Sequence, residues 1–192
     1  YFINPEVFFH LDRVKTAGLD TARRPTGGGI IFHTCDLAFS VLIPSSHSKF
    51  SLNTLENYAF INQAVVVAIR KFLGSLSFPQ LLIREKKQSP SKVSRQFCMA
   101  KPTVYDVMIE GKKVGGAAQR RMKQGYLHQG SISLTLPDLS LLKDLLKGGE
   151  HIVSLMQKNS FPLLGPSATS KEELKLARKE IQHLLKEALL NT

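Results

Sequence analysis

The stretch ARRPTGGGIIFHTCDLAFS, residues 22–40, places two arginines and three consecutive glycines directly before an apolar run. Glycine loses more backbone entropy than any other residue when its conformation is fixed, so three in a row require a reason. One reason is a tight turn in which a ligand approaches the backbone. The neighbouring arginines indicate that such a ligand is an anion, because a guanidinium matches carboxylate and phosphate geometry. A flexible surface turn is the plainer alternative for a glycine triplet taken alone.

The composition limits the class of protein. A chain of 192 residues is long enough for one substantial core and predicts one domain. The longest clean apolar run, AVVVAI at 64–69, is far too short to span a membrane. With two cysteines, a disulfide framework and a cysteine-rich metal site are excluded, and a reducing, cytoplasmic location is expected.

The net charge of +11 predicts an anionic partner, which is nucleic acid, a membrane surface or an acidic protein. No recognition-helix, RRM or zinc-finger pattern accompanies the charge, and the aromatic residues do not alternate with the basic ones. A basic nucleic-acid-binding module is therefore kept as the minor alternative.

Strands are predicted for the middle of the chain. Residues 30–43 read as two short strands joined by a turn at HTCD, with the second strand at 37–43. Residues 103–121 predict a hairpin with its turn at 110–112, and residues 126–136 predict a further strand. Residues 84–101, which hold six basic residues and one acidic residue, are expected to form a mobile loop, poorly ordered without ligand over 84–96.

Helices are predicted on both sides of these strands. One begins at Asn53 or Thr54 and ends at Gly74, with apolar residues at helical spacing. A capping box of Ser170 and Glu173 opens another, whose inward side is Leu174, Ala177, Ile181, Leu184, Leu185 and Ala188. The fold class is therefore α/β (α+β): a single domain with a mixed, largely antiparallel sheet flanked by helices.

Three further signals concern chemistry. Lys113 precedes two glycines and two alanines, where a ligand can lie against a strand beside a fixed positive charge. His128 lies two residues before a glycine, and Cys98 lies 15 positions before Lys113. Each is more often structural when taken alone: a surface lysine, a structural histidine and a small buried hydrophobe. A cysteine beside a lysine, however, can be an activated thiolate.

Taken together, these segments resemble the lipoate branch of the biotin and lipoate protein ligase superfamily. RRPTGGGIIFH at 23–33 is similar to the signature of that branch. KVGGAAQRR at 113–121, followed by HQGSISL at 128–134, resembles its second and third blocks in the same order. The glycine motif of a biotin-protein ligase, which is closer to GRGRxGR, is absent from the sequence.

The resemblance runs from residue 1 to about residue 136. The YF at positions 1 and 2 looks like the end of an early strand of the family. On this resemblance the chain is one ligase-type catalytic domain over residues 1–192, which lacks the family's first strand and helix and has no accessory C-terminal domain.

The resemblance also implies an activity. Lipoate-protein ligases use ATP and Mg²⁺ to activate a lipoyl carboxylate as an acyl-adenylate, and then transfer it to a lysine of a lipoyl domain. Lys113 would contact the acyl carbonyl and the phosphate oxygens, and no residue is assigned to a metal. The remaining site residues would line the acyl and phosphate site: Arg24, Thr26, Gly27, Gly28, Gly29, His33, Gly116, Ala118, Gln119 and His128. We expect Arg24 and Lys113 to converge on one anion pocket.

The implied partners are acidic lipoyl domains of 2-oxoacid dehydrogenases or the glycine cleavage H protein, and the +11 charge would attract such a domain. An acyl carrier protein is a further candidate partner. Nucleic acid is not expected as a partner.

The sequence departs from the ligase pattern after residue 136, where HIVSLMQKNSFPLLG at 151–165 is little like the family's adenylate-closing loop. FCMAKPTVYDVMIEGKKVGGAAQ at 97–119 instead resembles the cysteine-dependent octanoyltransferases of the superfamily, which need no ATP. In that alternative Cys98 carries the octanoyl group as a thioester, and its sulfur must lie near Lys113. The sequence favours the ligase narrowly and leaves the transferase open.

Overall fold

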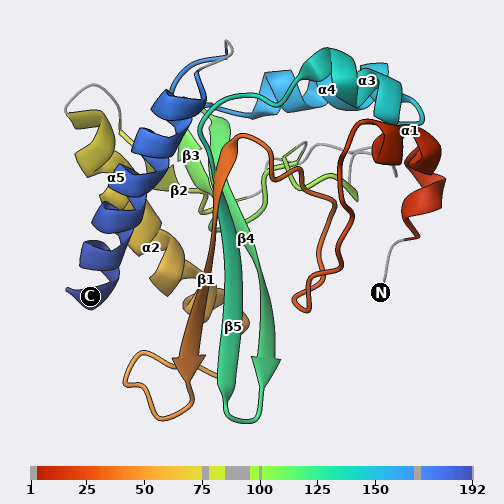
Figure 1. Ribbon diagram of the computed structural model, residues 1–192. Coiled ribbons are helices and arrows are strands. Elements are labelled where there is room, and N and C mark those ends of the chain that lie inside the picture. Colours follow the sequence, from red (N-terminus) through yellow and green to blue (C-terminus); the bar gives the residue numbers. More distant parts are fainter. Residues whose placement is uncertain (1–3, 75–77, 85–95, 100, 167–169, 192) are drawn as a thin grey trace.

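The computed structural model describes residues 4–74, 78–84, 96–99, 101–166 and 170–191 (Figure 1). Its centre is one open sheet of five strands in the order β1-β5-β4-β3-β2. The strands are β1 (Asp36–Pro44), β2 (Gln80–Leu81), β3 (Val107–Ile109), β4 (Lys112–Met122) and β5 (Gly125–Ser133). Every neighbouring pair of these strands is antiparallel.

The short strand β3 leaves most of one edge of β4 unpaired. β3 pairs with β4 only as far as Gly115, and the register shifts between Val107 and Met108. From Gly116 to Met122, β4 therefore has β5 as its strand neighbour on one side and no ladder to β3 on the other. Backbone groups along this part of β4 are available to a side chain or a ligand.

Two long helices cover one face of the sheet, as Figure 1 shows: α2 (Thr54–Leu73) and α5 (Lys171–Leu190). Asn53 caps α2, and the predicted capping box of Ser170 and Glu173 opens α5. Ile69, Ile132 and Ile181 are fully buried in the core between helices and sheet. Each such side chain contributes about 1.5–3 kcal/mol by its burial.

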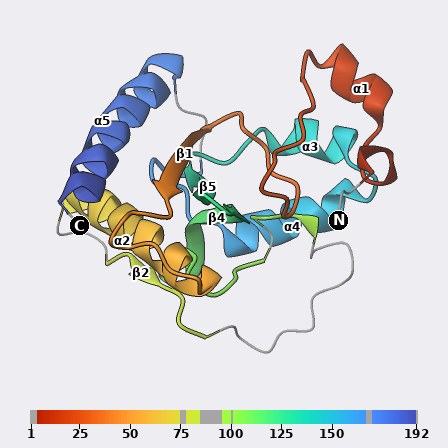
Figure 2. The ribbon, with the colours of Figure 1, turned by 90° about the horizontal axis from the view of Figure 1, so that it is seen from below.

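The other helical elements gather on the side of the sheet away from α2 and α5, as the view from below shows (Figure 2). They are the 3₁₀ helix η1 (Pro5–Val7), α1 (Leu11–Thr16), α3 (Leu139–Leu145) and α4 (Gly149–Asn159). A second apolar cluster, separate from the core under α2 and α5, packs these helices together and includes Phe9, Phe97 and Ile152. No helix among the described residues is both long and apolar enough for a bilayer span.

Most of the expected elements are confirmed: α2, the hairpin turn at 110–112, the strand after it and α5. The first of the two strands expected within 30–43 is wrong. Ile30 makes an isolated parallel bridge with Phe97, and the regular strand begins at Asp36. The apolar run at 30–32 therefore packs as an irregular segment in the second cluster, where Phe32 stacks on Phe97.

The segment 151–165, which is little like the family's adenylate-closing loop, lies largely in α4, whose Ile152, Val153 and Met156 are buried. Of the loop expected at 84–101, residues 85–95 and 100 lie outside the described residues, and so does most of the order prediction for 84–96. Its described end is anchored, because Phe97 is 1% exposed. The expectation of one domain without an accessory domain stays a prediction.

Candidate active site

The glycine triplet forms a tight turn that touches a distant segment. Gly27 and Gly28 have φ of 70° and 87°, values that residues other than glycine rarely adopt. Gly29 has an ordinary φ, but a Cβ there would lie 2.7 Å from the carbonyl oxygen of Gln96. Two of the glycines thus make the turn, and the third permits close approach of the backbone that carries Cys98.

The glycine turn is held over the sheet by side chains. Arg24 Nη2 donates a hydrogen bond to the Gly29 carbonyl at 3.2 Å, and Thr26 Oγ1 donates to Gln129 Oε1 at 3.0 Å. A Cβ on Gly28 would lie 3.3 Å from the Cβ of Ala118. Because side chains alternate along a strand, Ala118 shares with Gly116 the face of β4 opposite α2.

Cys98 lies beside this turn through two backbone hydrogen bonds. Ile30 N donates to Gln96 O at 2.6 Å, and Cys98 N donates to Ile30 O at 2.9 Å. Lys113 reaches the same point from β4: its Nζ lies 2.9 Å from Cys98 O and 3.6 Å from Cys98 Sγ. The cysteine and the lysine, 15 positions apart in sequence, therefore form a pair next to the glycine turn.

Lys113 is also part of a buried ion pair. Its Nζ lies 2.8 Å from Asp106 Oδ2, and the two side chains are 2% and 0% exposed. Gly116 makes room for the pair, since a Cβ there would lie 2.3 Å from Lys113 Cε and 2.7 Å from Asp106 Oδ1. In the block KVGGAAQRR, the second glycine is therefore required sterically, because a larger residue at Gly116 would overlap the ion pair.

The charge state of Lys113 follows from these contacts. Burial lowers the pKa of Lys113, but the Asp106 carboxylate, with a further contribution from Cys98, more than offsets this and leaves the pKa raised. Lys113 is therefore an ammonium at neutral pH and acts as a fixed positive charge rather than as a base. Tyr58, which reaches the site from α2, stays a neutral phenol because burial and Asp106 raise its pKa.

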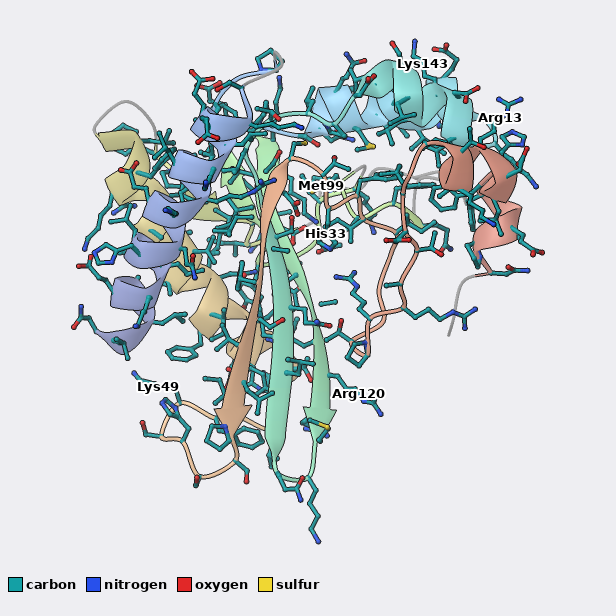
Figure 3. All side chains as sticks on the ribbon, viewed as in Figure 1. Arg13, His33, Lys49, Met99, Arg120 and Lys143 are labelled. Atoms are coloured by element: carbon teal, nitrogen blue, oxygen red, sulfur yellow. The ribbon has the colours of Figure 1, made fainter. Side chains whose placement is uncertain are left out.

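A cleft of about 860 Å³ opens beside the glycine turn. Arg24, the three glycines and His33 line it together with Val14 of α1 and the 18–23 segment. His33 Nδ1 lies 2.8 Å from Asp36 Oδ2, and this carboxylate also accepts a hydrogen bond from Ser131 at 2.5 Å. Figure 3 shows His33 on the segment that leads into β1, while Arg120 lies farther down β4.

Gln119 and His128 lie on the other face of the sheet. Their side chains are 2.8 Å apart, from Nε2 to Nδ1, and His128 contacts the rings of Tyr58 and Phe39. His128 is fully buried, and burial lowers its pKa to about 3. The structure thus brings together Cys98, Lys113, Gly116, Ala118 and the glycine turn, and separates Gln119 and His128 from them by the sheet. The roles of all these residues, including a shared anion pocket for Arg24 and Lys113, stay predictions.

Sequence reasoning missed Asp106 and Tyr58. Asp106 stands among apolar strand residues, and an acidic residue directly before a buried strand is the signal that could have found it. Tyr58 belongs to the apolar stripe of α2, where nothing distinguishes it from a core residue. Among the described residues, no group of three or more His, Cys, Asp and Glu side chains is placed to hold a metal ion.

The sequence matches the model of the biotin/lipoate A/B protein ligase family over residues 3–136, which include the glycine turn, Cys98 and Lys113. The match covers more than half of the chain, so the chain belongs to this family, as the sequence blocks predicted.

Curated relatives include the octanoyltransferases LipM of Bacillus subtilis, 30% identical over 159 residues, and of Geobacillus kaustophilus, 34% identical over 161 residues. Each of these alignments covers 83% of this chain and 57% of the relative. The chain thus spans a little over half the length of the curated relatives that it matches.

The fold is also that of the family. A T. acidophilum protein described as a lipoate protein ligase, solved with bound lipoic acid, superposes with a TM-score of 0.62 at 25% identity. The superposition covers 98% of this chain and 66% of the other. The predicted ligase-type catalytic fold is therefore confirmed.

Proposed function

We propose that this chain is an acyltransferase of the octanoyltransferase type, which moves a medium-chain acyl group from a carrier thioester to a lysine of a lipoyl domain. One observation carries the proposal: Cys98 Sγ lies 3.6 Å from the Nζ of a buried, charged lysine. A thiolate is the reactive form of cysteine, and a neighbouring ammonium stabilises it. The LipM relatives support the same chemistry.

The first step is transfer to the enzyme. The Cys98 thiolate attacks the acyl carbonyl of the carrier thioester, and the resulting oxyanion collapses with loss of the carrier thiolate, which takes up a proton. The Lys113 ammonium stabilises the thiolate before attack and the oxyanion during it. The products are an acyl thioester on Cys98 and the free carrier thiol.

The second step is transfer to the acceptor. The uncharged ε-amine of the acceptor lysine attacks the Cys98 thioester, an amide bond forms, the carbon–sulfur bond breaks, and the amine proton is released. The thiolate of Cys98 is regenerated beside Lys113. No nucleotide enters either step, because the acyl group arrives as an activated thioester.

A second candidate is the ATP-dependent ligase that the sequence favoured narrowly. The Arg24 guanidinium over the glycine turn supports it, since such a turn beside an arginine suits a phosphate or a carboxylate. The T. acidophilum neighbour with lipoic acid supports a lipoyl substrate. In this candidate Lys113 contacts the acyl-adenylate, and Cys98 is a neighbour without a covalent role.

Donor choice separates the two candidates. The protein is incubated with an apo lipoyl domain and either octanoyl-carrier protein alone or lipoate, or octanoate, with Mg-ATP. Mass spectrometry of the acceptor then identifies the productive donor. We expect acylation from the carrier protein without ATP, and an octanoyl thioester on the Cys98 peptide when the acceptor is omitted. Modification that requires ATP, with no trapped thioester, would select the ligase.

A further inference from the structure

The three hydrogens of the Lys113 ammonium each have an acceptor. Two are oxygens, Asp106 Oδ2 at 2.8 Å and Cys98 O at 2.9 Å. The third acceptor is Cys98 Sγ at 3.6 Å. An ammonium has three donors in a fixed tetrahedral arrangement, so the two oxygens determine where the third hydrogen points. Removal of either oxygen would free the ammonium to turn away from the sulfur.

Asp106 is fixed by its own turn and not by Lys113 alone. Its Oδ2 accepts hydrogen bonds from the backbone N of Thr103 at 2.7 Å and from the Thr103 hydroxyl at 3.0 Å. The backbone N of Asp106 donates in return to Thr103 O at 3.0 Å. The carboxylate is therefore held in place before the lysine reaches it, which is what a group that orients another residue requires.

Asp106 is also the counter-ion of Lys113. Among the described residues, three titratable groups face the ammonium: Asp106 from just before β3, Cys98 from the 96–99 segment and Tyr58 from α2. Tyr58 is neutral at physiological pH because burial raises its pKa. When Cys98 is a thiol or carries an acyl group, Asp106 is the negative charge among these three that balances the ammonium. A fully buried amine without a counter-ion loses its proton readily.

We propose that Asp106 is a positioning residue for the Cys98–Lys113 pair: its carboxylate, fixed by Thr103, aims the Lys113 ammonium at the Cys98 sulfur and keeps it charged throughout the acyl-transfer cycle. The biological meaning of this inference rests on the proposed transferase activity. Its chemical content, that Asp106 controls the reactivity of Cys98 through Lys113, does not.

The sign of one measurement distinguishes this role from a direct effect of charge. In Asp106→Asn, removing a negative charge near Cys98 would by itself make the thiolate easier to form and would lower the midpoint pH of its alkylation. If Asp106 acts through Lys113, the lysine loses its proton, the thiolate loses its cation, and the midpoint rises. An opposite charge within hydrogen-bonding range shifts a pKa by about 1–3 units, so we expect a rise of about one pH unit or more.

The experiment measures iodoacetamide alkylation of Cys98 against pH, with the Cys98 peptide resolved from Cys35 by mass spectrometry. The variants are Asp106→Asn, Lys113→Met, the double variant, and Asp144→Asn as a control in an exposed ion pair with Arg13. We expect the alkylation midpoint to rise in both single variants and to stay unchanged in Asp144→Asn. The midpoint of the double variant should be no higher than that of Lys113→Met. An unchanged or lowered midpoint in Asp106→Asn overturns the proposal.

Two provisions keep the test decisive. If Asp106→Asn does not fold, as judged by circular dichroism, the Lys113 ¹³Cε resonance of the unaltered protein is titrated instead. We expect it to titrate above about pH 10.4, the ordinary value for a lysine side chain, and titration below that value contradicts the proposal. Alkylation also needs no acyl donor, so a failed acyl-transfer assay with the expected alkylation midpoints would remove the proposed function and leave the role of Asp106 intact.

Discussion

Two buried polar groups lie on opposite faces of the sheet, and one is charged at neutral pH while the other is neutral. Lys113, on the glycine-turn face, is 2% exposed and is paired with Asp106 and Cys98. His128, on the helix face, is fully buried and is paired with the neutral Gln119, while its Nε2 has no hydrogen-bond partner among the described residues. Burial penalises the charged form of both groups.

The difference between the two lies in the counter-ion. A carboxylate 2.8 Å away keeps Lys113 charged in spite of its burial. No carboxylate of the described part of the chain stands beside His128, and burial lowers its pKa to about 3. Depth of burial alone therefore does not decide the charge state of a polar group in this fold. A fixed opposite charge decides it, because the carboxylate offsets the desolvation cost that would otherwise remove the charge.

The largest effect is expected at Cys98, which stands beside the charged group. Cys98→Ser exchanges a thiolate for a hydroxyl that keeps its proton, so octanoyl transfer to the acceptor should fall at least about a thousandfold, or roughly 4 kcal/mol of barrier. Cys35→Ser is the matched control, because serine can still donate the hydrogen bond that the Cys35 thiol makes to Thr135 O. Full turnover in Cys98→Ser would point to the ATP-dependent route.

The next effect concerns the space that the ion pair occupies. In Gly116→Ala the new Cβ would overlap Lys113 and Asp106, and disrupting a buried pair costs about 3 kcal/mol. We expect urea unfolding to report a loss of that order, together with reduced acyl transfer. Gly115→Ala is the control, since its Cβ would face α2 and come no closer than 3.4 Å to its neighbours. Equal losses of stability in the two variants would show that the ion pair is not the cause of the effect.

His128, on the helix face, should make the stability of the protein depend on pH. The pKa of His128 is about 3 in the folded protein and near 6.5 when unfolded, so the unfolded chain takes up the proton first as the pH falls. Stability is therefore lost from about pH 6.5 down to about pH 3. Between pH 6.5 and pH 5 the loss amounts to about 2 kcal/mol.

His128→Gln lacks this titration, so the stability advantage of the unaltered protein over the variant should shrink by that amount. Urea unfolding of both proteins at the two pH values measures it. Parallel stability curves would mean that His128 titrates normally, and the contrast with Lys113 would be lost.

The smallest effect is expected at an exposed ion pair, which sharpens the contrast with the buried one. Arg13 and Asp144 join α1 to α3 with side chains that are 48% and 58% exposed. Solvent screens such a pair, so Arg13→Ala should cost less than about 1 kcal/mol, and the cost should shrink further in high salt. Thermal unfolding at low and high ionic strength tests both points. A loss as large as that of Gly116→Ala would show that solvent exposure does not weaken ion pairs in this fold.

Much of the architecture follows from local sequence signals. The capping box of Ser170 and Glu173, the Asn53 cap of α2 and the turn at 110–112 were all predictable, because each depends on contacts between residues a few positions apart. The glycine triplet also predicted a turn, although the sequence suggested the approach of a ligand there, and the structure places the Gln96 backbone against Gly29. Helices α3 and α4 were missed, although the Asp138 cap and the spacing of Ile152, Val153 and Met156 carried the signal.

The sequence by itself determined the family, the helices and strands that carry the site, and the candidate residues Cys98 and Lys113. Only the tertiary structure decided how these residues are used. It placed Asp106 against Lys113 through the bulged pairing of β3 with β4, and it put Gln119 and His128 behind the sheet by the alternation of side chains along β4 and β5. The physical reason is that a local pattern specifies the backbone of a segment, whereas the charge state of a buried group depends on which distant side chain comes within about 3 Å of it.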